Sequence, residues 1–315
     1  METQLHSLIE SLRSGDARTL ARAISAVENR TPGWSDLLKV LFPHTGKARI
    51  IGLTGSPGAG KSTLVDQLAR LYRKQDRTVG IIAVDPTSPY TGGAILGDRI
   101  RMQDHFADPG IYIRSMATRG SLGGLARTTA DVASVLDASG RDVILIETVG
   151  VGQDEVDIVR LADITVVILV PGMGDDVQTI KAGIMEIADV FVINKSDREG
   201  AERVEREIRA LQSLAMRPDG WTPPIVKTVA SEGQGVQELA AAIAAYESYL
   251  KKENRALKKS VENWQDRLIE MLRDAMLDKA RAQFTDGNLS KLASEVAEHK
   301  RDPYSLVEEI AGKAL

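Results

Sequence analysis

Residues 50–63 read Ile50-Ile51-Gly52-Leu53-Thr54-Gly55-Ser56-Pro57-Gly58-Ala59-Gly60-Lys61-Ser62-Thr63, and this stretch decides the fold. An apolar run leads into Gly-x-x-x-x-Gly-Lys-Ser, and a helical pattern of apolar residues follows. This is the P-loop signature in its required order of strand, glycine-rich turn and helix N-terminus. The glycines let backbone N–H groups face phosphate oxygens, and the helix dipole stabilises the anion. We therefore predict a nucleotide site made by Gly55, Ser56, Pro57, Gly58, Ala59, Gly60, Lys61, Ser62 and Thr63.

Two of these residues have predicted chemical roles. Lys61 is expected to reach the β and γ phosphates, and the Ser62 hydroxyl is expected to ligate Mg²⁺. The motif alone does not say which nucleotide binds or for what purpose.

The bulk composition is that of an ordinary globular protein. The chain has 315 residues, of which 43% are hydrophobic and 27% charged, so we expect one large domain with appendages. A net charge of −4 gives no reason to expect nucleic-acid or membrane binding. The absence of cysteine excludes disulfides and thiolate metal sites. The start of the chain lacks a secretory pattern, and the longest apolar runs are too short to span a bilayer, so we expect a cytoplasmic protein.

Three regions differ in their hydrophobic pattern. Residues 1–45 show helical spacing and form a predicted N-terminal helical extension. Residues 46–250 alternate β-branched runs with helical stretches, which predicts an α/β domain with a mostly parallel sheet flanked by helices. Residues 251–315 form a predicted helical arm in which Trp264, Leu268, Leu272 and Met276 recur every four residues. The predicted strands are 49–54, 78–84, 111–114, 142–147, 164–170, 189–194 and 225–229, with helices at 62–74, 124–138, 199–212 and 234–250.

A second motif follows a later predicted strand. Asn194-Lys195-Ser196-Asp197 has the form Asn-Lys-x-Asp, in which a carboxylate accepts two hydrogen bonds from guanine that adenine cannot supply together. Leaving such a buried carboxylate unpaired against adenine costs a few kcal/mol. Asn194, Lys195 and Asp197 therefore predict guanine as the base, so the nucleotides are GTP and GDP. Ser231 and Glu232 follow the last predicted strand, where a loop contacting the base edge is expected.

Acidic residues end two other predicted strands. Glu147 is followed three residues later by Gly150, a pattern that suits a carboxylate near Mg²⁺ and an N–H on the γ-phosphate. Asp85 and Asp98 are further candidates for the Mg²⁺ shell, with helix capping as the alternative for each. Val151 stands where Ras-like proteins have the glutamine that positions water, and Gln153 lies two residues further on. We predict slow intrinsic hydrolysis, with Lys61, Glu147 and Gln153 as catalytic candidates.

Together these motifs resemble the MeaB/ArgK-type GTPases, the metallochaperone-like proteins associated with methylmalonyl-CoA mutase. The resemblance rests on 55–63, Val-Asp-Pro-Thr-Ser-Pro at 84–89, Gly-Asp-Arg-Ile-Arg-Met at 97–102, Glu-Thr-Val-Gly-Val-Gly-Gln at 147–153 and Asn-Lys-Ser-Asp at 194–197. It implies a homodimer held by the C-terminal arm. It also implies a partner, an adenosylcobalamin-dependent acyl-CoA mutase, to which the protein gates cofactor delivery and which it protects. The family's Mg²⁺ site agrees with Ser62, Asp85, Asp98 and Glu147.

Three other functions use a P-loop. A nickel-insertion metallochaperone GTPase relies on Cys and His, and this chain has no Cys and four scattered His. An ATP-dependent small-molecule kinase is disfavoured by Asn194 and Asp197. A third alternative is a scaffolding protein with a permanently bound nucleotide. Measuring GTP turnover with and without candidate mutases distinguishes it from a GTP-hydrolysing switch.

Overall fold

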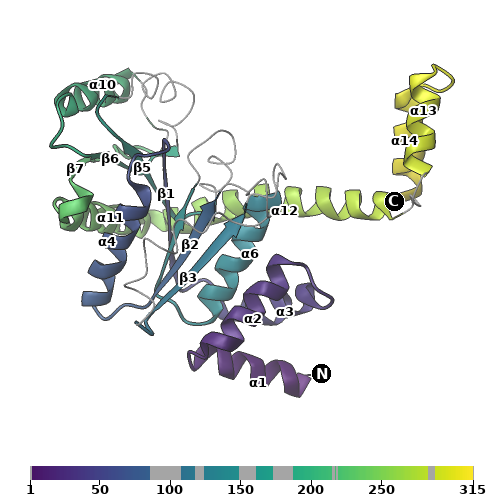
Figure 1. The fold of residues 1–315 in the computed structure, drawn as a ribbon, viewed down its shortest axis with the longest axis horizontal. Helices are drawn as coiled ribbons and strands as arrows, with labels where there is room; N and C mark the ends of the chain where they lie inside the picture. Colours follow the sequence, from purple (N-terminus) through teal and green to yellow (C-terminus); the bar gives the residue numbers. More distant parts are fainter. Residues whose placement is uncertain are drawn as a thin grey trace. The chain divides into compact units, whose positions relative to one another are not determined.

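The computed structural model describes residues 2–85, 108–117, 124–148, 161–172, 187–214, 217, 219–282 and 288–314. Its centre is a sheet of seven strands in the order β3-β2-β4-β1-β5-β6-β7, and all of the strand pairings are parallel (Figure 1). The predicted α/β fold with a parallel sheet is therefore confirmed. The strands are β1 Arg49–Gly55, β2 Val79–Asp85, β3 Ile111–Ala117, β4 Val143–Glu147, β5 Ile164–Leu169, β6 Val190–Asn194 and β7 Ile225–Thr228.

The strand sequences explain why the sheet lies inside the molecule. Every residue of β4, β5 and β6 is buried, as expected for β-branched runs covered on both faces. The order places β1 between β4 and β5, although β2 and β3 follow β1 in the chain. The strands β2, β3 and β4 thus lie on one side of β1, and the later strands β5, β6 and β7 lie on the other side. In open parallel sheets this switch point is where ligands bind, at the carboxyl ends of the strands.

Helices cover both faces of the sheet. On one face, α4 (Lys61–Lys74) and α11 (Val236–Leu250) pack their apolar sides over the central strands. On the other face, α6 (Gly124–Ala138) covers β2 and β4, and α10 (Ala201–Leu214) covers β5 and β6. This three-layer arrangement leaves the carboxyl ends of the strands as the place for a site.

The N-terminal extension is helical and belongs to the hydrophobic core beside α6 (Figure 1). Apolar side chains such as Leu20, Ile24 and Val27 are almost fully buried there. The Arg114 side chain of β3 also forms an ion pair with Glu28, so the extension is tied to the edge of the sheet. The extension consists of α1 (Glu2–Arg13), α2 (Ala17–Glu28), α3 (Trp34–Leu41) and the short helix η1 (Phe42–His44).

Aspartates hold the amino ends of the strands in register. Three of them stand immediately before a strand, and each accepts the N–H of a residue at the start of a neighbouring strand. Such N–H groups would otherwise lack a partner within the sheet. These bonds link Asp142 to Thr78 at 2.7 Å, Asp163 to Ile50 at 2.9 Å, and Asp189 to Thr165 at 2.9 Å.

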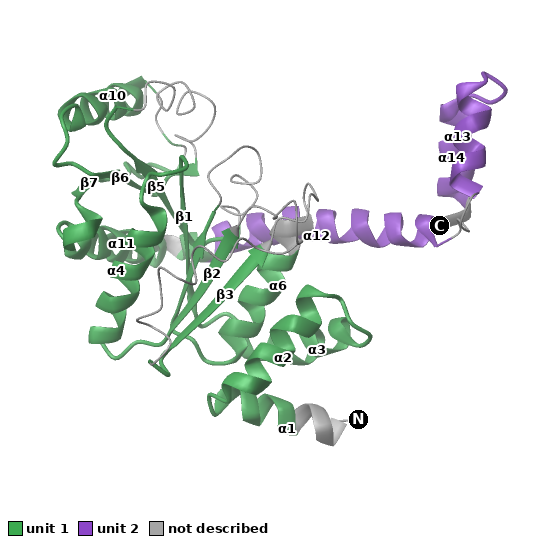
Figure 2. Cartoon of the chain, viewed as in Figure 1, with its two compact units in different colours: residues 1–256 green, residues 257–315 purple. Residues whose placement is uncertain are grey.

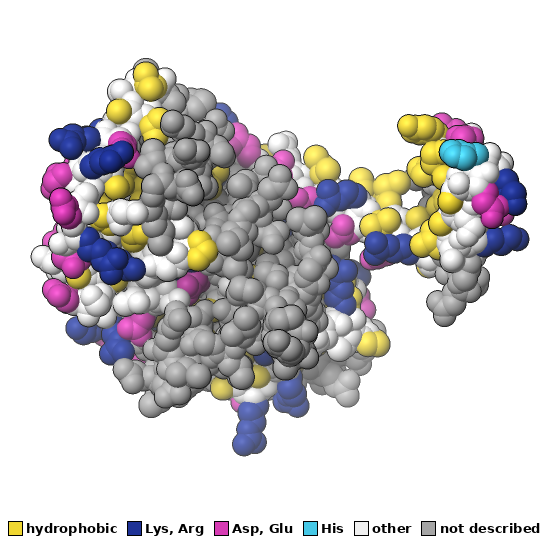
Figure 3. Space-filling view, turned by 45° about the horizontal axis from the view of Figure 1, so that its top comes forward, with side chains coloured by type: hydrophobic (Ala, Val, Ile, Leu, Met, Phe, Trp, Pro, Cys, Tyr) yellow, Lys and Arg dark blue, Asp and Glu magenta, His cyan; other side chains and the backbone are white. Residues whose placement is uncertain are grey.

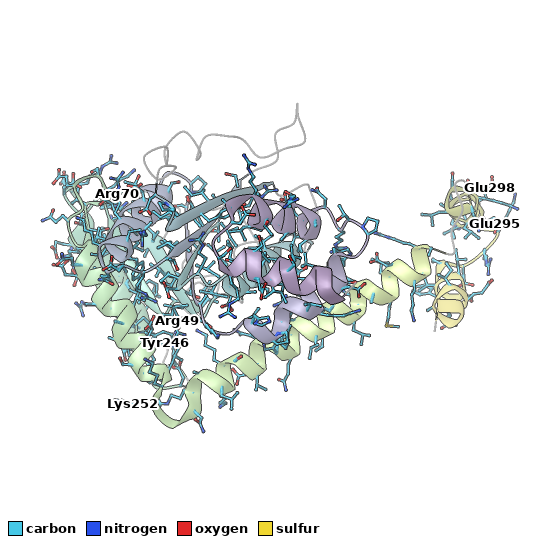
Figure 4. All side chains as sticks on the ribbon, turned by 90° about the horizontal axis from the view of Figure 1, so that it is seen from below. Arg49, Arg70, Tyr246, Lys252, Glu295 and Glu298 are labelled. Atoms are coloured by element: carbon cyan, nitrogen blue, oxygen red, sulfur yellow. The ribbon has the colours of Figure 1, made fainter. Side chains whose placement is uncertain are left out.

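An arginine fastens the start of the central strand to α11. The Arg49 guanidinium lies 3.5 Å from the Asp163 carboxylate and 3.2 Å from that of Glu247. Tyr246, labelled with Arg49 in Figure 4, precedes Glu247 on the same helix. Tyr246 packs against the Trp221 ring, with 5.0 Å between ring centroids. The polar contacts of this edge are structural and lie at the end of the sheet opposite the P-loop.

The described chain divides into two compact units, Met1–Ala256 and Leu257–Leu315 (Figure 2). The second unit contains most of α12 (Arg255–Arg281), together with α13 (Asn288–Ala297) and α14 (Pro303–Ala314), and the short helix η5 (Lys252–Asn254) precedes it. The predicted helical arm is therefore confirmed as helical. None of the described helices is both long and apolar enough to cross a membrane.

The arm helices expose many hydrophobic side chains (Figure 3). No residue of α12 is buried, although the helix has 27 residues. Some of its exposed apolar residues recur at intervals of four or seven, which places these residues along one broad side of the helix. This series consists of Leu257, Val261, Leu268, Leu272 and Met276, and Ile269, Met271 and Leu277 are exposed beside it.

Candidate functional site

The P-loop connects the end of β1 to the first turn of α4. Gly60 precedes the helix with a left-handed backbone (φ 88°), and Gly58 has φ 79°. The Lys61 side chain is buried in the loop, where its Nζ donates to the carbonyl oxygens of Gly55 at 2.6 Å and Ser56 at 3.1 Å. An ammonium group and a helix N-terminus thus converge on one loop, an arrangement that favours a bound phosphate chain.

Two glycines of the motif have neighbours that leave no room for a side chain. A Cβ on Gly60 would lie 2.4 Å from Nδ2 of Asn194, and a Cβ on Gly55 would lie 2.2 Å from the carbonyl oxygen of Ile168. Both positions also have positive φ, which other residues rarely adopt. The glycine spacing of the motif is therefore required by the packing of β5 and β6 against the loop.

A carboxylate from β4 meets the first turn of α4. The Ser62 hydroxyl donates to Oε1 of Glu147 at 2.6 Å, and Glu147 is only 4% exposed. Glu147 pairs in register with Leu53 of β1, two residues before the P-loop begins. The alternation of side chains along a strand therefore points Glu147 to the face that α4 covers. The predicted partners Ser62 and Glu147 are brought together at the switch point.

Asn194 links three segments that are far apart in the sequence. Its Nδ2 donates to the carbonyl oxygen of Ala59 at 2.8 Å. Its Oδ1 accepts from the Thr228 hydroxyl at 3.0 Å and from the Ala230 N–H at 3.1 Å. Asn194 and Thr228 are 2% and 0% exposed, so water does not compete for these bonds. The first residue of the predicted guanine motif thus holds the P-loop and the loop after β7 in place.

Lys195 makes a second connection to the P-loop. Its Nζ donates to the carbonyl oxygen of Gly58 at 2.8 Å, and its backbone is left-handed with φ 55°. Asp197, two residues further, is exposed, and its role in reading the base stays a prediction. Ser231 and Glu232 are exposed on the short helix η4 (Ala230–Glu232), next to the Ala230 N–H that Asn194 holds.

Four predicted site residues lie wholly or partly outside the described part of the chain. Asp85 is the last residue of β2, which adjoins β4, but its side chain lies outside the description. Asp98, Gly150 and Gln153 lie outside the described residues, so their predicted roles stay predictions.

The described part of the site offers oxygen ligands rather than a transition-metal cluster. Among the described residues, no group of three or more His, Cys, Asp and Glu lies together. The Ser62 hydroxyl and the Glu147 carboxylate are hard oxygen donors 2.6 Å apart. Mg²⁺ uses one or two carboxylates together with substrate phosphates and water, so this donor pair fits it.

Three threonines at the site were not identified from the sequence. Thr228 bonds to Asn194, and the Thr148 hydroxyl donates to the Thr54 hydroxyl at 3.1 Å. Thr148 directly follows Glu147, and Thr54 directly precedes Gly55, so adjacency to both motifs was the available signal.

The seven-stranded parallel sheet and this loop define a P-loop nucleotide-binding protein of the α/β class. The family model described as "Methylmalonyl Co-A mutase-associated GTPase MeaB" matches residues 20–285. The chain therefore belongs to the MeaB family of P-loop GTPases, and this membership implies guanine-nucleotide binding and GTPase activity.

Individual relatives agree with this assignment. A protein of Pyrococcus abyssi is 48% identical over 99% of this chain and 98% of its own length. GTPase ArgK of Escherichia coli is 38% identical over 79% of this chain and 78% of its own length. The mitochondrial methylmalonic aciduria type A homolog of Mus musculus is 38% identical over 74% of this chain and 60% of its own. A crystal structure of an LAO/AO transport system kinase has a TM-score of 0.73 at 27% identity, covering 99% of this chain and 98% of that one.

Proposed function

We propose that this protein is a GTP-hydrolysing switch that serves as a chaperone for an adenosylcobalamin-dependent acyl-CoA mutase of the methylmalonyl-CoA mutase type. The observation that carries the proposal is the family match, which spans the P-loop, the strand ending in Glu147 and the guanine motif. In this role the protein gates delivery of the cofactor and protects the mutase from inactivation.

The geometry supports a guanine nucleotide lying across the carboxyl ends of β1, β4 and β6. Lys61 holds the β and γ phosphates together with the N–H groups of the loop, as the sequence predicts. Asp197 reads the guanine edge, and Asn194 and Lys195 hold its loop against the P-loop. Ser231 and Glu232 border the base on the other side.

Ser62 and Glu147 would hold Mg²⁺ beside the phosphates, and Asp85 and Asp98 would complete the set of oxygen ligands. The donor pair at 2.6 Å supports this assignment for the first two residues. When bound, the ion neutralises charge on the β and γ phosphate oxygens. Glu147 has one more methylene than the aspartate that most GTPases carry here.

Hydrolysis of GTP to GDP and phosphate is slow without a partner. Val151 follows Gly150 and has no group that orients water, so Gln153 is the candidate for that task. A switch of this kind works because a partner binds one nucleotide state better than the other. The slow rate therefore leaves the timing of the switch to the mutase.

The protein forms a homodimer through its C-terminal arm. The support is the series of exposed apolar residues on α12, among which Leu268 and Leu272 are 57% and 62% exposed. Helices with such a series associate with a second helix and bury it. Replacing both leucines with Glu should yield a monomer in light scattering. Leu214→Glu is the matched control, because Leu214 is 83% exposed on α10, and a dimer that survives the double change would exclude the arm.

The chaperone role is tested with purified methylmalonyl-CoA mutase. We expect a complex in gel filtration whose stability differs between GDP and a non-hydrolysable GTP analogue, and a faster GTP turnover when the mutase is present. If no complex forms with either nucleotide and turnover is unchanged, the chaperone role is wrong while the GTPase assignment stands.

A further inference from the structure

Two buried threonines join the ends of β1 and β4. Thr54 and Thr148 are each 1% exposed, and the Thr148 hydroxyl donates to Oγ1 of Thr54 at 3.1 Å. The Thr148 backbone N–H also donates to the carbonyl oxygen of Leu53 at 3.1 Å, which extends the β1–β4 pairing past its last strand residue. The bonds fix where the chain leaves β4.

The hydroxyl pair is unusual for its surroundings, because both strands are otherwise almost entirely apolar. Val would fill nearly the same volume as Thr without a polar group. A buried hydroxyl that loses its partner is penalised, so the pair is satisfied only when the two strand ends adopt one relative position. Two valines at these positions would tolerate small shifts of one strand end against the other better than the hydroxyl pair does.

The pair lies one residue away from both anchors of the nucleotide site. Thr54 precedes Gly55, whose carbonyl oxygen accepts from Lys61. Thr148 follows Glu147, whose carboxylate accepts from Ser62. Glu147 and Leu53 are register partners on the α4 side of the sheet, so Thr54 lies on the opposite side. The threonines therefore act on the site through the backbone, from the face of the sheet opposite the Ser62–Glu147 pair.

We propose that Thr54 and Thr148 are positioning residues that hold the Glu147 carboxylate at Ser62 and thereby set the Mg²⁺ affinity of the nucleotide site. This inference rests on the proposed Mg²⁺-dependent GTPase function. Glu147 has a long side chain with three torsions, so its carboxylate is well placed only if its backbone is held. The threonine bond supplies that restraint on the side of the sheet away from the metal.

The test uses the full chain with a fluorescent GDP analogue. The variant Thr148→Val removes the donor and keeps the shape. We expect the Mg²⁺ concentration at which half of the maximal amount of analogue is retained to rise about tenfold. This is the effect of one lost buried hydrogen bond. Affinity for the analogue in EDTA should stay within about twofold, because the restraint acts through the metal ligand. Thr148→Ser should restore the wild-type Mg²⁺ response.

Thr129→Val is the matched control, because Thr129 is 0% exposed on α6 and its hydroxyl lies 4.0 Å from the Met116 sulfur. It should leave the Mg²⁺ response unchanged. If Thr148→Val fails to fold, Thr54→Val removes the acceptor and should give the same shift. An unchanged Mg²⁺ response, or equal losses with and without Mg²⁺, would overturn the proposal. A wild-type protein that binds no GDP would instead refute the proposed function.

Discussion

Replacing Asn194 with Ala should destabilise the protein even when no nucleotide is bound. Three hydrogen bonds are lost, to Ala59, Thr228 and Ala230, at distances of 2.8, 3.0 and 3.1 Å. Each such bond is worth about 1 kcal/mol net, which gives a loss of about 3 kcal/mol in the free energy of unfolding. Since Thr228 is 0% exposed, its hydroxyl cannot turn to water as a replacement.

Urea unfolding of the nucleotide-free chain measures this loss, and calorimetry with GDP measures the effect on binding. We expect GDP affinity to fall as well, because the P-loop and the loop after β7 lose their common support. Asp197→Asn is the matched control: Asp197 is exposed, so its unfolding free energy should stay within about 0.5 kcal/mol of wild type. Wild-type stability in Asn194→Ala would refute the reasoning, since it would mean that the asparagine acts on the base alone.

Three further predictions concern the loop and the sheet. Lys61→Ala should lower GTP turnover at least about a hundredfold in a phosphate-release assay while circular dichroism stays unchanged; wild-type turnover would mean that the phosphate site is misplaced. Gly60→Ala should abolish GDP binding in calorimetry, because the new Cβ would lie 2.4 Å from Asn194, and retained binding would show that the loop yields. Burial acts to raise the pKa of Asp142, but hydrogen bonds from the Thr78 backbone and hydroxyl outweigh it, so the pKa lies below the ordinary 3.8. The stability that this carboxylate contributes is therefore present above pH 3.8 and is lost as the pH falls through its folded value. Urea unfolding between pH 3 and 7 should show that the unfolding free energies of wild type and Asp142→Asn converge at the acid end. A difference that stays constant with pH would exclude a contribution from the ionisation of Asp142.

The sequence predicted the elements of the fold well because the signals were local. All seven expected strands occur, within a few residues of their expected bounds, since β-branched runs between glycines and polar turns have few alternatives. The strand order was not accessible in the same way. The strand order depends on which buried strands pair. The β-branched sequences of β4 and β5 contain nothing that identifies β1 as their common neighbour.

The residues of the candidate site likewise fall into those predicted from local motifs and those that only the tertiary structure brings together. The P-loop, Glu147 and Asn194 were identified because each motif ends or follows an apolar strand. The contact between Asn194 and Ala59 spans 135 residues and appears only when β6 packs near the loop. Thr54 and Thr148 were missed because a threonine in a β-branched run looks like another strand former. Asp98, Gly150 and Gln153 stay predictions from their motifs.

Nucleotide selectivity of the wild-type chain is the most direct test of the guanine-reading site. A fluorescent GDP analogue is bound in the presence of Mg²⁺ and is then displaced with unlabelled GDP or ADP. A site in which Asp197 reads the base predicts that GDP displaces it at a concentration at least about a thousandfold lower than ADP. Equal displacement by the two nucleotides would contradict a guanine-reading site, and with it the switch built upon that site.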